Sequence, residues 1–135
     1  MLASTKGRYA LRVMADMAEN CKDDEFIPLK DVAQRQEISE KYLEAIVKLL
    51  VSKDLLTGHR GKGGGYKLSK APEEYTVGEI LRAAEGDIAP VACLVEGAEK
   101  CHRYDSCKTI GMWTKLDNII SDYLDGIKLT DIYEE

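Results

Sequence analysis

The sequence lacks any long apolar run. Nowhere do its 135 residues approach about 18 uninterrupted apolar residues, the length that a helix needs to cross a membrane. Charged residues interrupt the N-terminal stretch MLASTKGRYALRVM too early for a signal peptide. We therefore expect a cytoplasmic protein without a membrane segment, of a length that suits one domain with its own hydrophobic core.

The sequence also lacks the residue patterns of common enzyme sites. We find no Ser-His-Asp set and no pair of catalytic carboxylates. The glycine-rich stretch around Lys62 superficially resembles a phosphate-binding loop, but a Walker motif needs a strand before it, a helix after it and Ser or Thr after the Lys. Here Gly63 follows Lys62, and the strand-like residues YKLSK come next. We therefore expect no enzymatic activity.

An overall excess of basic residues is missing too. The chain carries 19 Lys and Arg against 24 Asp and Glu, a formal net charge of −5, which at first argues against a nucleic-acid-binding protein. Residues 39–70, however, have 7 basic and 3 acidic residues, whereas residues 71–135 have 6 and 14. Charge varies along any solvated chain, but this distribution favours a DNA-binding half joined to a sensing or dimerising half.

Residues 38–70 carry the strongest pattern in the sequence. Ser39 occupies a helix N-cap position, and apolar residues recur after it at helical spacing, with polar and mostly basic positions between them. The apolar set is Tyr42, Leu43, Ile46, Val47, Leu49, Leu50 and Leu55. Extended runs follow at 55–58 and 65–70, and five of the eight residues from 58 to 65 are Gly, which permits positive φ in a protruding turn. A helix followed by a basic, glycine-rich hairpin is typical of a winged helix-turn-helix.

Two helices are predicted before this segment. The first covers residues 6–20 and is capped by Ser4 or Thr5, and the second covers residues 29–36. The short turn between the second helix and Ser39 matches helix-turn-helix spacing. Cys21, at the end of the first helix, is expected to be a small buried hydrophobe.

Two helices are predicted after the hairpin. Thr76 and Glu79 form a capping box for a helix over 77–85, which Gly86 ends. The longest helix covers 109–127, and an acidic tail follows it over 128–135. The fold class is therefore mainly α with a small β-hairpin wing, plus a long C-terminal dimerisation helix.

The long helix has more apolar surface than a domain of this size needs to bury. Its stripe comprises Ile110, Trp113, Leu116, Ile119, Ile120, Tyr123, Leu124 and Ile127. Intramolecular packing explains such a stripe in many proteins. A protein that reads paired DNA half-sites needs paired protomers, however, so we expect a homodimer joined along this helix.

The predicted reading helix and wing supply candidate contacts to double-stranded DNA. Cations neutralise phosphates and so provide most of the affinity, and hydroxyl groups donate hydrogen bonds to phosphates or base edges. Glu44 either accepts from a cytosine amino group or is an ordinary exposed helix residue, while Arg60 suits insertion into a narrow minor groove. The candidate DNA-binding residues are Ser39, Lys41, Tyr42, Glu44, Lys48, Arg60, Lys62, Gly63 and Tyr66, with Lys67 as a further phosphate contact.

Three of the four cysteines, Cys93, Cys101 and Cys107, lie within 15 residues of one another. In a reducing compartment such a group is more often metal-binding or redox-active than disulfide-bonded. Three thiolates suit an iron–sulfur cluster. A reactive-thiol or disulfide switch, promoted by neighbouring Lys and Arg residues, and a structural zinc site are the alternatives.

Several motifs resemble the Rrf2 family of winged-helix transcriptional regulators, and within it the IscR-like branch, whose relatives include NsrR, RirA and CymR. The motifs are STKGRYALRVMADMA, ISEKYLEAIVKLL, RGKGGGYKLSK and TVGEILRAAEG, followed by MWTKLDNII and KLTDIY. This resemblance covers essentially the whole chain. It implies a dimeric regulator that binds inverted-repeat DNA, with Ser39, Glu44 and Arg60 at reading positions.

The resemblance to IscR-like members also implies an iron–sulfur cluster, either 2Fe–2S or 4Fe–4S, held by Cys93, Cys101 and Cys107. The fourth ligand is not evident, because Ile110 stands where IscR-like members have His and Arg8 stands where NsrR-like members have Asp. CymR-like relatives lack the cluster and are controlled by a partner protein of cysteine metabolism, which gives an alternative function.

The resemblance divides the chain into three regions. Residues 1–86 form the winged helix-turn-helix domain with its supporting helix, residues 87–108 form a cysteine-bearing sensor loop, and residues 109–135 form the dimerisation helix and tail. Because the sensor loop separates the DNA-binding domain from the dimer helix, we expect changes at its cysteines to alter the relative placement of the two wings.

Overall fold

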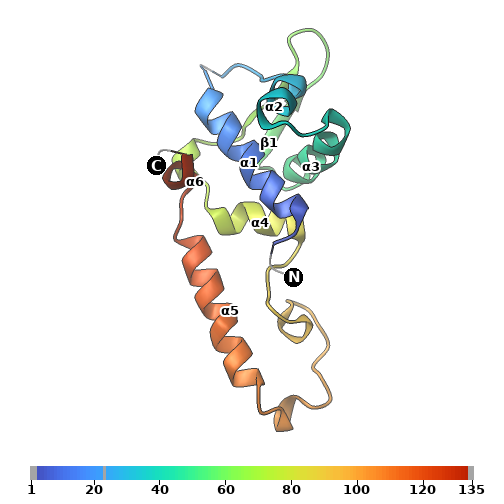
Figure 1. Cartoon of the computed structure of the whole chain (residues 1–135), viewed down its shortest axis with the longest axis vertical. Coiled ribbons are helices and arrows are strands. Elements are labelled where there is room, and N and C mark those ends of the chain that lie inside the picture. Colours follow the sequence, from blue (N-terminus) through green and yellow to red (C-terminus); the bar gives the residue numbers. More distant parts are fainter. Residues whose placement is uncertain (1–2, 23, 134–135) are drawn as a thin grey trace.

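The computed structural model describes residues 3–22 and 24–133. Five helices and a two-stranded antiparallel sheet gather around one core, and a sixth, long helix extends away from it (Figure 1). The helices are α1 (Thr5–Asn20), α2 (Leu29–Gln36), α3 (Glu40–Ser52), α4 (Val77–Glu85), α5 (Ile110–Asp125) and α6 (Leu129–Tyr133), and the strands are β1 (Leu56–His59) and β2 (Gly65–Leu68). In the described part of the chain, no helix is long and apolar enough to cross a membrane.

The core forms where the apolar faces of the helices meet. The side chains that are almost fully buried there include Val13, Met14 and Met17 of α1, Val32 of α2, and Leu43, Ile46, Val47 and Leu50 of α3. A smaller cluster of Val77, Leu81 and Ile88 contacts Ile120 and Leu124 of α5. Four of the apolar residues predicted for α3, Leu43, Ile46, Val47 and Leu50, are thus buried, whereas Tyr42 is 38% exposed. The mainly helical fold class with a β-hairpin wing is confirmed.

A residue distant in sequence caps the first helix. Ser4 is the N-cap residue of α1, but its side chain makes no capping bond to the helix. Instead, the Glu85 carboxylate at the end of α4 accepts hydrogen bonds from Ser4 N at 2.9 Å, Ser4 Oγ at 2.5 Å and Gly7 N at 2.8 Å. Gly7 permits this approach because a Cβ there would collide with the carboxylate. Ser4 therefore occupies the predicted N-cap position, but its hydroxyl binds Glu85 and not the helix.

Helix α1 buries one charged residue. Asp16 is 4% exposed and accepts hydrogen bonds from Arg35 and Gln36. These charged and polar partners make its burial tolerable. Cys21 was expected to be buried, but it lies exposed just after the helix, where its thiol donates to Ala18 O.

The turn between α2 and α3 follows the predicted helix-turn-helix pattern. Glu37 ends α2 in the left-handed conformation, with φ of 55°. Ser39 then caps α3, and its hydroxyl oxygen accepts from Tyr42 N at 3.2 Å. The sequence predicts this turn well because the N-cap signal of Ser39 acts on residues within the first turn of α3.

The wing is a hairpin in which Leu56 pairs with Leu68 and His59 with Gly65. A third segment joins it in the middle of β2. Ile27 N donates to Tyr66 O at 2.7 Å, and Tyr66 N donates to Ile27 O at 2.9 Å. Gly65 makes this approach possible, because a Cβ there would collide with the Ile27 carbonyl group. The wing is therefore attached to the segment that leads into α2.

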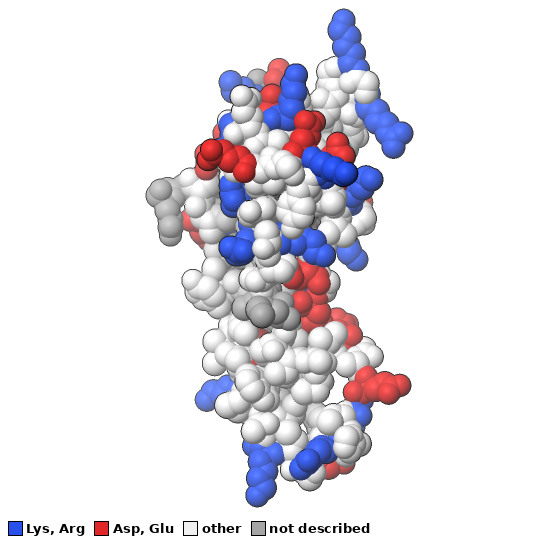
Figure 2. All heavy atoms as spheres, turned by 45° about the vertical axis from the view of Figure 1, so that its right-hand side comes forward, with Lys and Arg blue, Asp and Glu red and all other residues white. Residues whose placement is uncertain are grey.

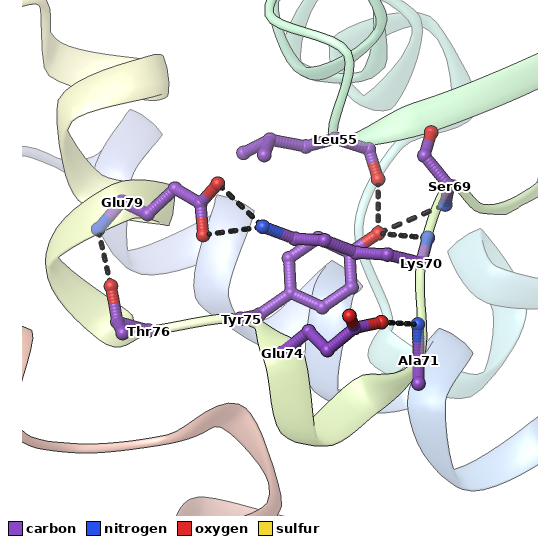
Figure 3. Close-up of polar contacts among 8 residues, drawn as sticks. All are labelled: Leu55, Ser69, Lys70, Ala71, Glu74, Tyr75, Thr76 and Glu79. Carbon is purple, nitrogen blue, oxygen red and sulfur yellow. Dashed lines mark hydrogen bonds and ion pairs between the residues drawn. The ribbon is translucent and has the colours of Figure 1, made fainter.

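The C-terminal end of the chain returns to the core. The tail predicted over 128–135 is wrong for its described part, because α6 forms there and packs on α1, with Leu129 fully buried. The capping box predicted for α4 is only half formed. Thr76 Oγ1 accepts from Glu79 N at 3.1 Å, but the Glu79 carboxylate binds Lys70 instead of closing the box (Figure 3).

Candidate nucleic-acid interface and cysteine segment

Helix α3 presents a polar face that its buried face holds in place. Leu43, Ile46, Val47 and Leu50 are fully buried, so the helix cannot rotate without exposing them. Its opposite face leaves the predicted DNA-binding residues Lys41, Glu44 and Lys48 exposed. Within the described residues, neither lysine forms an ion pair. The face is therefore free to meet an anionic partner.

The first turn of α3 orients two hydroxyl groups. Ser39 Oγ accepts from Tyr42 N, which leaves the serine hydroxyl proton available for another acceptor. The Tyr42 ring, 38% exposed, packs edge-on against Tyr9 of α1 with 5.6 Å between centroids. Arg12 lies 5.1 Å from the Tyr9 centroid and donates to Gln36 at the end of α2. The Tyr42 ring is therefore held in its direction by Tyr9, on the side that faces α1.

Glycines shape the tip of the wing. Gly61 and Gly63 have φ of 95° and 74°, and Gly64 N donates to Gly61 O at 2.9 Å. This turn leaves Arg60 and Lys62 exposed, and neither has an ion-pair partner among the described residues. Positively charged side chains project from the wing at the upper right of Figure 2, well clear of the rest of the molecule.

A groove separates α3 from the wing. Its lining includes the predicted DNA-binding residues Glu44, Lys48, Arg60 and Tyr66. The other predicted residues belong to the same two elements. Ser39, Lys41 and Tyr42 lie at or near the start of α3, and Lys62 and Gly63 lie in the wing turn. A helix and a protruding basic turn on either side of a groove fit the two elements that a winged helix places on DNA.

Sequence reasoning missed two groove residues with basic side chains. Lys30 of α2 and His59 of β1 also line the groove. Phe26 stacks on the His59 ring, with 5.0 Å between centroids, and the Lys67 ammonium group lies 5.0 Å from the Phe26 centroid. Helical periodicity says nothing about Lys30, because its place beside the wing depends on the pairing of Ile27 with Tyr66. Lys67, predicted to contact phosphates, forms an ion pair with Asp24 at 3.3 Å.

The cysteine segment between α4 and α5 extends away from the core, alongside α5 (Figure 1). Asp87 orders its beginning by accepting from Ala89 N and Glu96 N. Further along, Lys100 pairs with Asp105 at 3.2 Å and covers the Tyr104 ring. Two single 3-10 turns, at Ala92–Leu94 and Tyr104–Ser106, are the only regular elements between residues 87 and 108.

The three predicted metal ligands are not brought together. Cys93 and Cys101 are exposed and Cys107 is half-buried. In residues 3–22 and 24–133, no three His, Cys, Asp or Glu side chains gather into a potential metal site. The thiol donors therefore suit an iron–sulfur cluster by their chemistry, but this conformation of the segment does not assemble them, and it shows no fourth ligand.

The surroundings of Cys107 favour its thiolate form. Hydrogen bonds from the side chain and backbone of Thr109 lower the pKa of the Cys107 thiol, and Arg103 adds a smaller electrostatic contribution. Cys107 Sγ lies 3.4 Å from Thr109 Oγ1. A lowered pKa increases the thiolate fraction, which favours both metal binding and oxidation.

Helix α5 leaves an apolar face uncovered. Met112, Ile119 and Tyr123 are 56%, 56% and 68% exposed, and Leu116 is 37% exposed. Only the C-terminal part of the helix is fixed to the core, through Ile120, Leu124 and a two-point ion pair between Arg82 and Asp125 at 2.6 and 3.2 Å. Contiguous exposed apolar faces of this kind mark interaction surfaces.

Comparisons with known proteins agree with this arrangement. The sequence profile of the Rrf2 family, described as iron-dependent transcriptional regulators, matches residues 3–135. An HTH-type transcriptional regulator IscR from Aliivibrio salmonicida is 36% identical over 132 residues, which cover 98% of this chain and 77% of that protein. These relatives are regulators and not enzymes, as the sequence predicted.

Solved structures show the same fold. CymR, titled the global cysteine regulator of B. subtilis, is 34% identical with a TM-score of 0.77, covering 99% of this chain and 97% of its own. IscR from T. potens is 33% identical with a TM-score of 0.75, covering 99% and 87%. The chain therefore belongs to the Rrf2 family of transcriptional regulators.

Proposed function

We propose that the chain is a homodimeric regulator that binds inverted-repeat DNA, with α3 in the major groove and the wing tip in the adjacent minor groove. The observation that carries this proposal is the position of α3 and the wing on either side of one groove, where Lys48 and Arg60 have no ion-pair partner among the described residues. Because its proposed ligand is chromosomal DNA, we place the protein in the cytoplasm.

Each proposed DNA contact has a chemical role. Lys41, Lys48 and Lys62 neutralise phosphates, and Ser39 and Tyr42 donate hydrogen bonds from the start of α3. Glu44 accepts from a cytosine amino group, which gives discrimination at the expense of affinity. Arg60 enters the minor groove, while Gly63 and Tyr66 shape and hold the wing that carries it.

The exposed face of α5 supports the dimer. Two copies of this helix can cover each other's Met112, Leu116, Ile119 and Tyr123, because a two-fold interface uses the same patch on both protomers.

The proposal divides the chain into three regions. Residues 1–86 bind DNA, residues 87–108 sense and residues 109–135 hold the dimer. In the proposed dimer, the two DNA-binding units lie on either side of the paired α5 helices.

We further infer that Cys93, Cys101 and Cys107 hold an iron–sulfur cluster, which supplies a group sensitive to iron, redox state and nitric oxide. The donor type and the Rrf2 membership support this inference. The segment must change conformation to gather the three thiols, and its exposed position permits that change. A thiol switch is the second candidate, because the pKa of Cys107 is lowered without any metal.

Anaerobic purification separates these candidates. A brown protein with visible absorbance and about one sulfide for each iron supports the cluster. A colourless protein that retains zinc, or one that forms a disulfide within residues 93–107 on oxidation, would contradict it. Cys101→Ser should remove the colour, whereas Cys21→Ser, the matched control outside the segment, should retain it. Loss of colour in both variants would contradict the ligand assignment.

The DNA proposal has its own test. Arg60→Ala should weaken duplex binding while leaving the melting temperature unchanged, because Arg60 is exposed and has no ion-pair partner among the described residues. Unchanged affinity would contradict the role of the wing. Control by a partner protein of cysteine metabolism stays a prediction, which capture of a defined cysteine-biosynthetic enzyme by the purified chain would test.

A further inference from the structure

We propose that Tyr75 is a positioning residue for DNA binding, which sets the angle of the wing by joining the base of the wing to the chain between α5 and α6. This inference rests on the proposed DNA-binding function. Tyr75 does not line the groove, and its side chain is hydrogen-bonded to Leu55, Ser69 and Lys70 within the described residues. Its effect on DNA would therefore pass through the wing.

The Tyr75 side chain closes the base of the hairpin. Its hydroxyl donates to Leu55 O at 2.7 Å and accepts from Ser69 N at 2.9 Å and Lys70 N at 3.3 Å (Figure 3). Leu55 precedes β1, and Ser69 and Lys70 follow β2, so one oxygen atom connects both strands where they leave the wing. The direct bond from Ser69 N to Leu55 O is longer, at 3.4 Å.

The hydroxyl is shielded from water. Tyr75 is fully buried, and burial raises the pKa of its phenol, so the hydroxyl keeps its proton and can donate. Lys70 Nζ lies 4.8 Å from the centroid of the Tyr75 ring and binds both oxygens of Glu79 at 2.9 and 3.1 Å. Figure 3 shows the Lys70 side chain lying across the ring, which covers it on that side.

The backbone of Tyr75 is hydrogen-bonded to the connection between α5 and α6. Leu129 N donates to Tyr75 O at 3.0 Å, and Val77 N donates to Ile127 O at 2.9 Å. Thr76 and Lys128 form an antiparallel bridge between these two bonds. The connection from α5 to α6 is thus paired directly with the residue whose hydroxyl holds the wing base. In the proposed mechanism, a shift of this connection moves the Tyr75 backbone and, with it, the base of the wing.

The wing has a second attachment that serves as a pivot. Ile27 and Tyr66 hold the middle of β2 through two backbone hydrogen bonds. If the base loosens while this pair remains, the hairpin turns about Tyr66 and the tip with Arg60 moves in the opposite direction. Tyr75→Phe keeps the buried ring but removes the hydroxyl, leaving Leu55 O, Ser69 N and Lys70 N with fewer partners.

A double-mutant cycle tests this role. The affinities of wild type, Tyr75→Phe, Arg60→Ala and the double variant are measured by fluorescence anisotropy on a duplex that the wild type selects from a random-sequence pool. We expect Arg60→Ala to weaken binding about tenfold and Tyr75→Phe about threefold or more. The double variant should be weaker than Arg60→Ala alone by clearly less than the factor for Tyr75→Phe, because Lys62 is then the wing-tip cation that a misplaced wing still moves. Glu73→Gln, at an exposed position in the turn that precedes Tyr75, should bind like the wild type.

Two outcomes would overturn the inference alone: unchanged affinity of Tyr75→Phe, or multiplication of the two single effects in the double variant, which marks a merely structural role. Failure of the wild type to bind any duplex would overturn the proposed function and this inference together. Amide exchange in the wild type gives a second test that needs no variant. Deep protection of Ser69 N and Lys70 N supports the inference, and exchange as fast as at the wing tip contradicts it.

Discussion

Arg35 of α2 holds the buried carboxylate of Asp16 on α1 through three hydrogen bonds, of which the shortest is 2.7 Å. Gln36 Nε2 adds a fourth at 2.9 Å. The same Gln36 side chain accepts from Arg12 Nε at 3.2 Å. This network fixes the first two helices relative to each other, and so sets the turn from which the reading helix α3 begins.

Asp16→Asn should destabilise the fold. The substitution removes the negative charge that faces Arg35, although the amide keeps the shape of the side chain. Because Arg35 is partly exposed, its guanidinium can recover some solvation, and we expect a loss of about 1 to 3 kcal/mol in the free energy of unfolding. Urea unfolding measures it. Glu19→Gln, an exposed position on the same helix, should change the value little, and an equal loss in both variants would contradict the assignment.

The Glu85 cap should make stability depend on pH. Burial alone would raise the pKa of Glu85, but the hydrogen bonds from Ser4 and Gly7 outweigh it and lower the pKa below its ordinary value of 4.5. The stabilisation is therefore present above that ordinary value and is lost as the pH falls through the lowered pKa of the folded state.

Glu85→Gln should accordingly lower stability by about 1 kcal/mol at neutral pH and by less in acid. Chemical unfolding at neutral pH and at about pH 3 measures the difference. Exposed Glu73→Gln provides the control. A penalty for Glu85→Gln that is the same at both pH values would show that the charge of the carboxylate plays no part in capping α1.

Gly65→Ala should disturb the wing more than Gly61→Ala. Both glycines have positive φ, so an alanine at either position costs about 1 kcal/mol in backbone strain. Only at Gly65 does the added methyl group also meet another segment, the Ile27 carbonyl, whereas at Gly61 nothing lies within 4 Å. Thermal melting and duplex affinity should both fall further for Gly65→Ala. Equal effects would contradict the close packing of Ile27 on β2.

Ile119→Glu should separate the proposed dimer without unfolding the protomer. Ile119 is 56% exposed in the single chain, so its loss costs the core little, but a carboxylate in the seam between two α5 helices would lose its water. We expect the dimer dissociation constant to rise at least about tenfold, as measured by analytical ultracentrifugation. Asn118→Glu, on the exposed side of the same helix, is the control. An unchanged constant for Ile119→Glu would remove α5 from the interface.

Sequence reasoning predicted what depends on neighbouring residues. Ser39 caps α3, Gly86 ends α4 and the glycines bend the wing, because each signal acts over one turn or less. The apolar spacing of α3 also identified its buried and exposed faces, and with them the predicted DNA-binding residues on this helix. The wing motif and the motifs of the first and third helices indicate the family from the sequence alone.

Long-range partners escaped prediction. No spacing connects Glu85 with Ser4, Asp16 with Arg35 or Tyr75 with the wing, because those contacts arise only when distant segments pack together. Leu129 was assigned to a tail since a helix of five residues carries too little periodicity to be recognised. The exposure of Cys21 depended on where the chain turns after α1, which the apolar pattern does not specify.

The most direct test of the account is a titration of the purified chain with short DNA duplexes at several salt concentrations. Fluorescence anisotropy gives the affinity, and the mass of the complex gives the number of protomers bound. We predict two protomers per bound duplex and an affinity that falls steeply as salt rises, because phosphates are neutralised by Lys and Arg. A single protomer that shows no affinity for duplex DNA at low salt would contradict the account, whatever its cysteines hold.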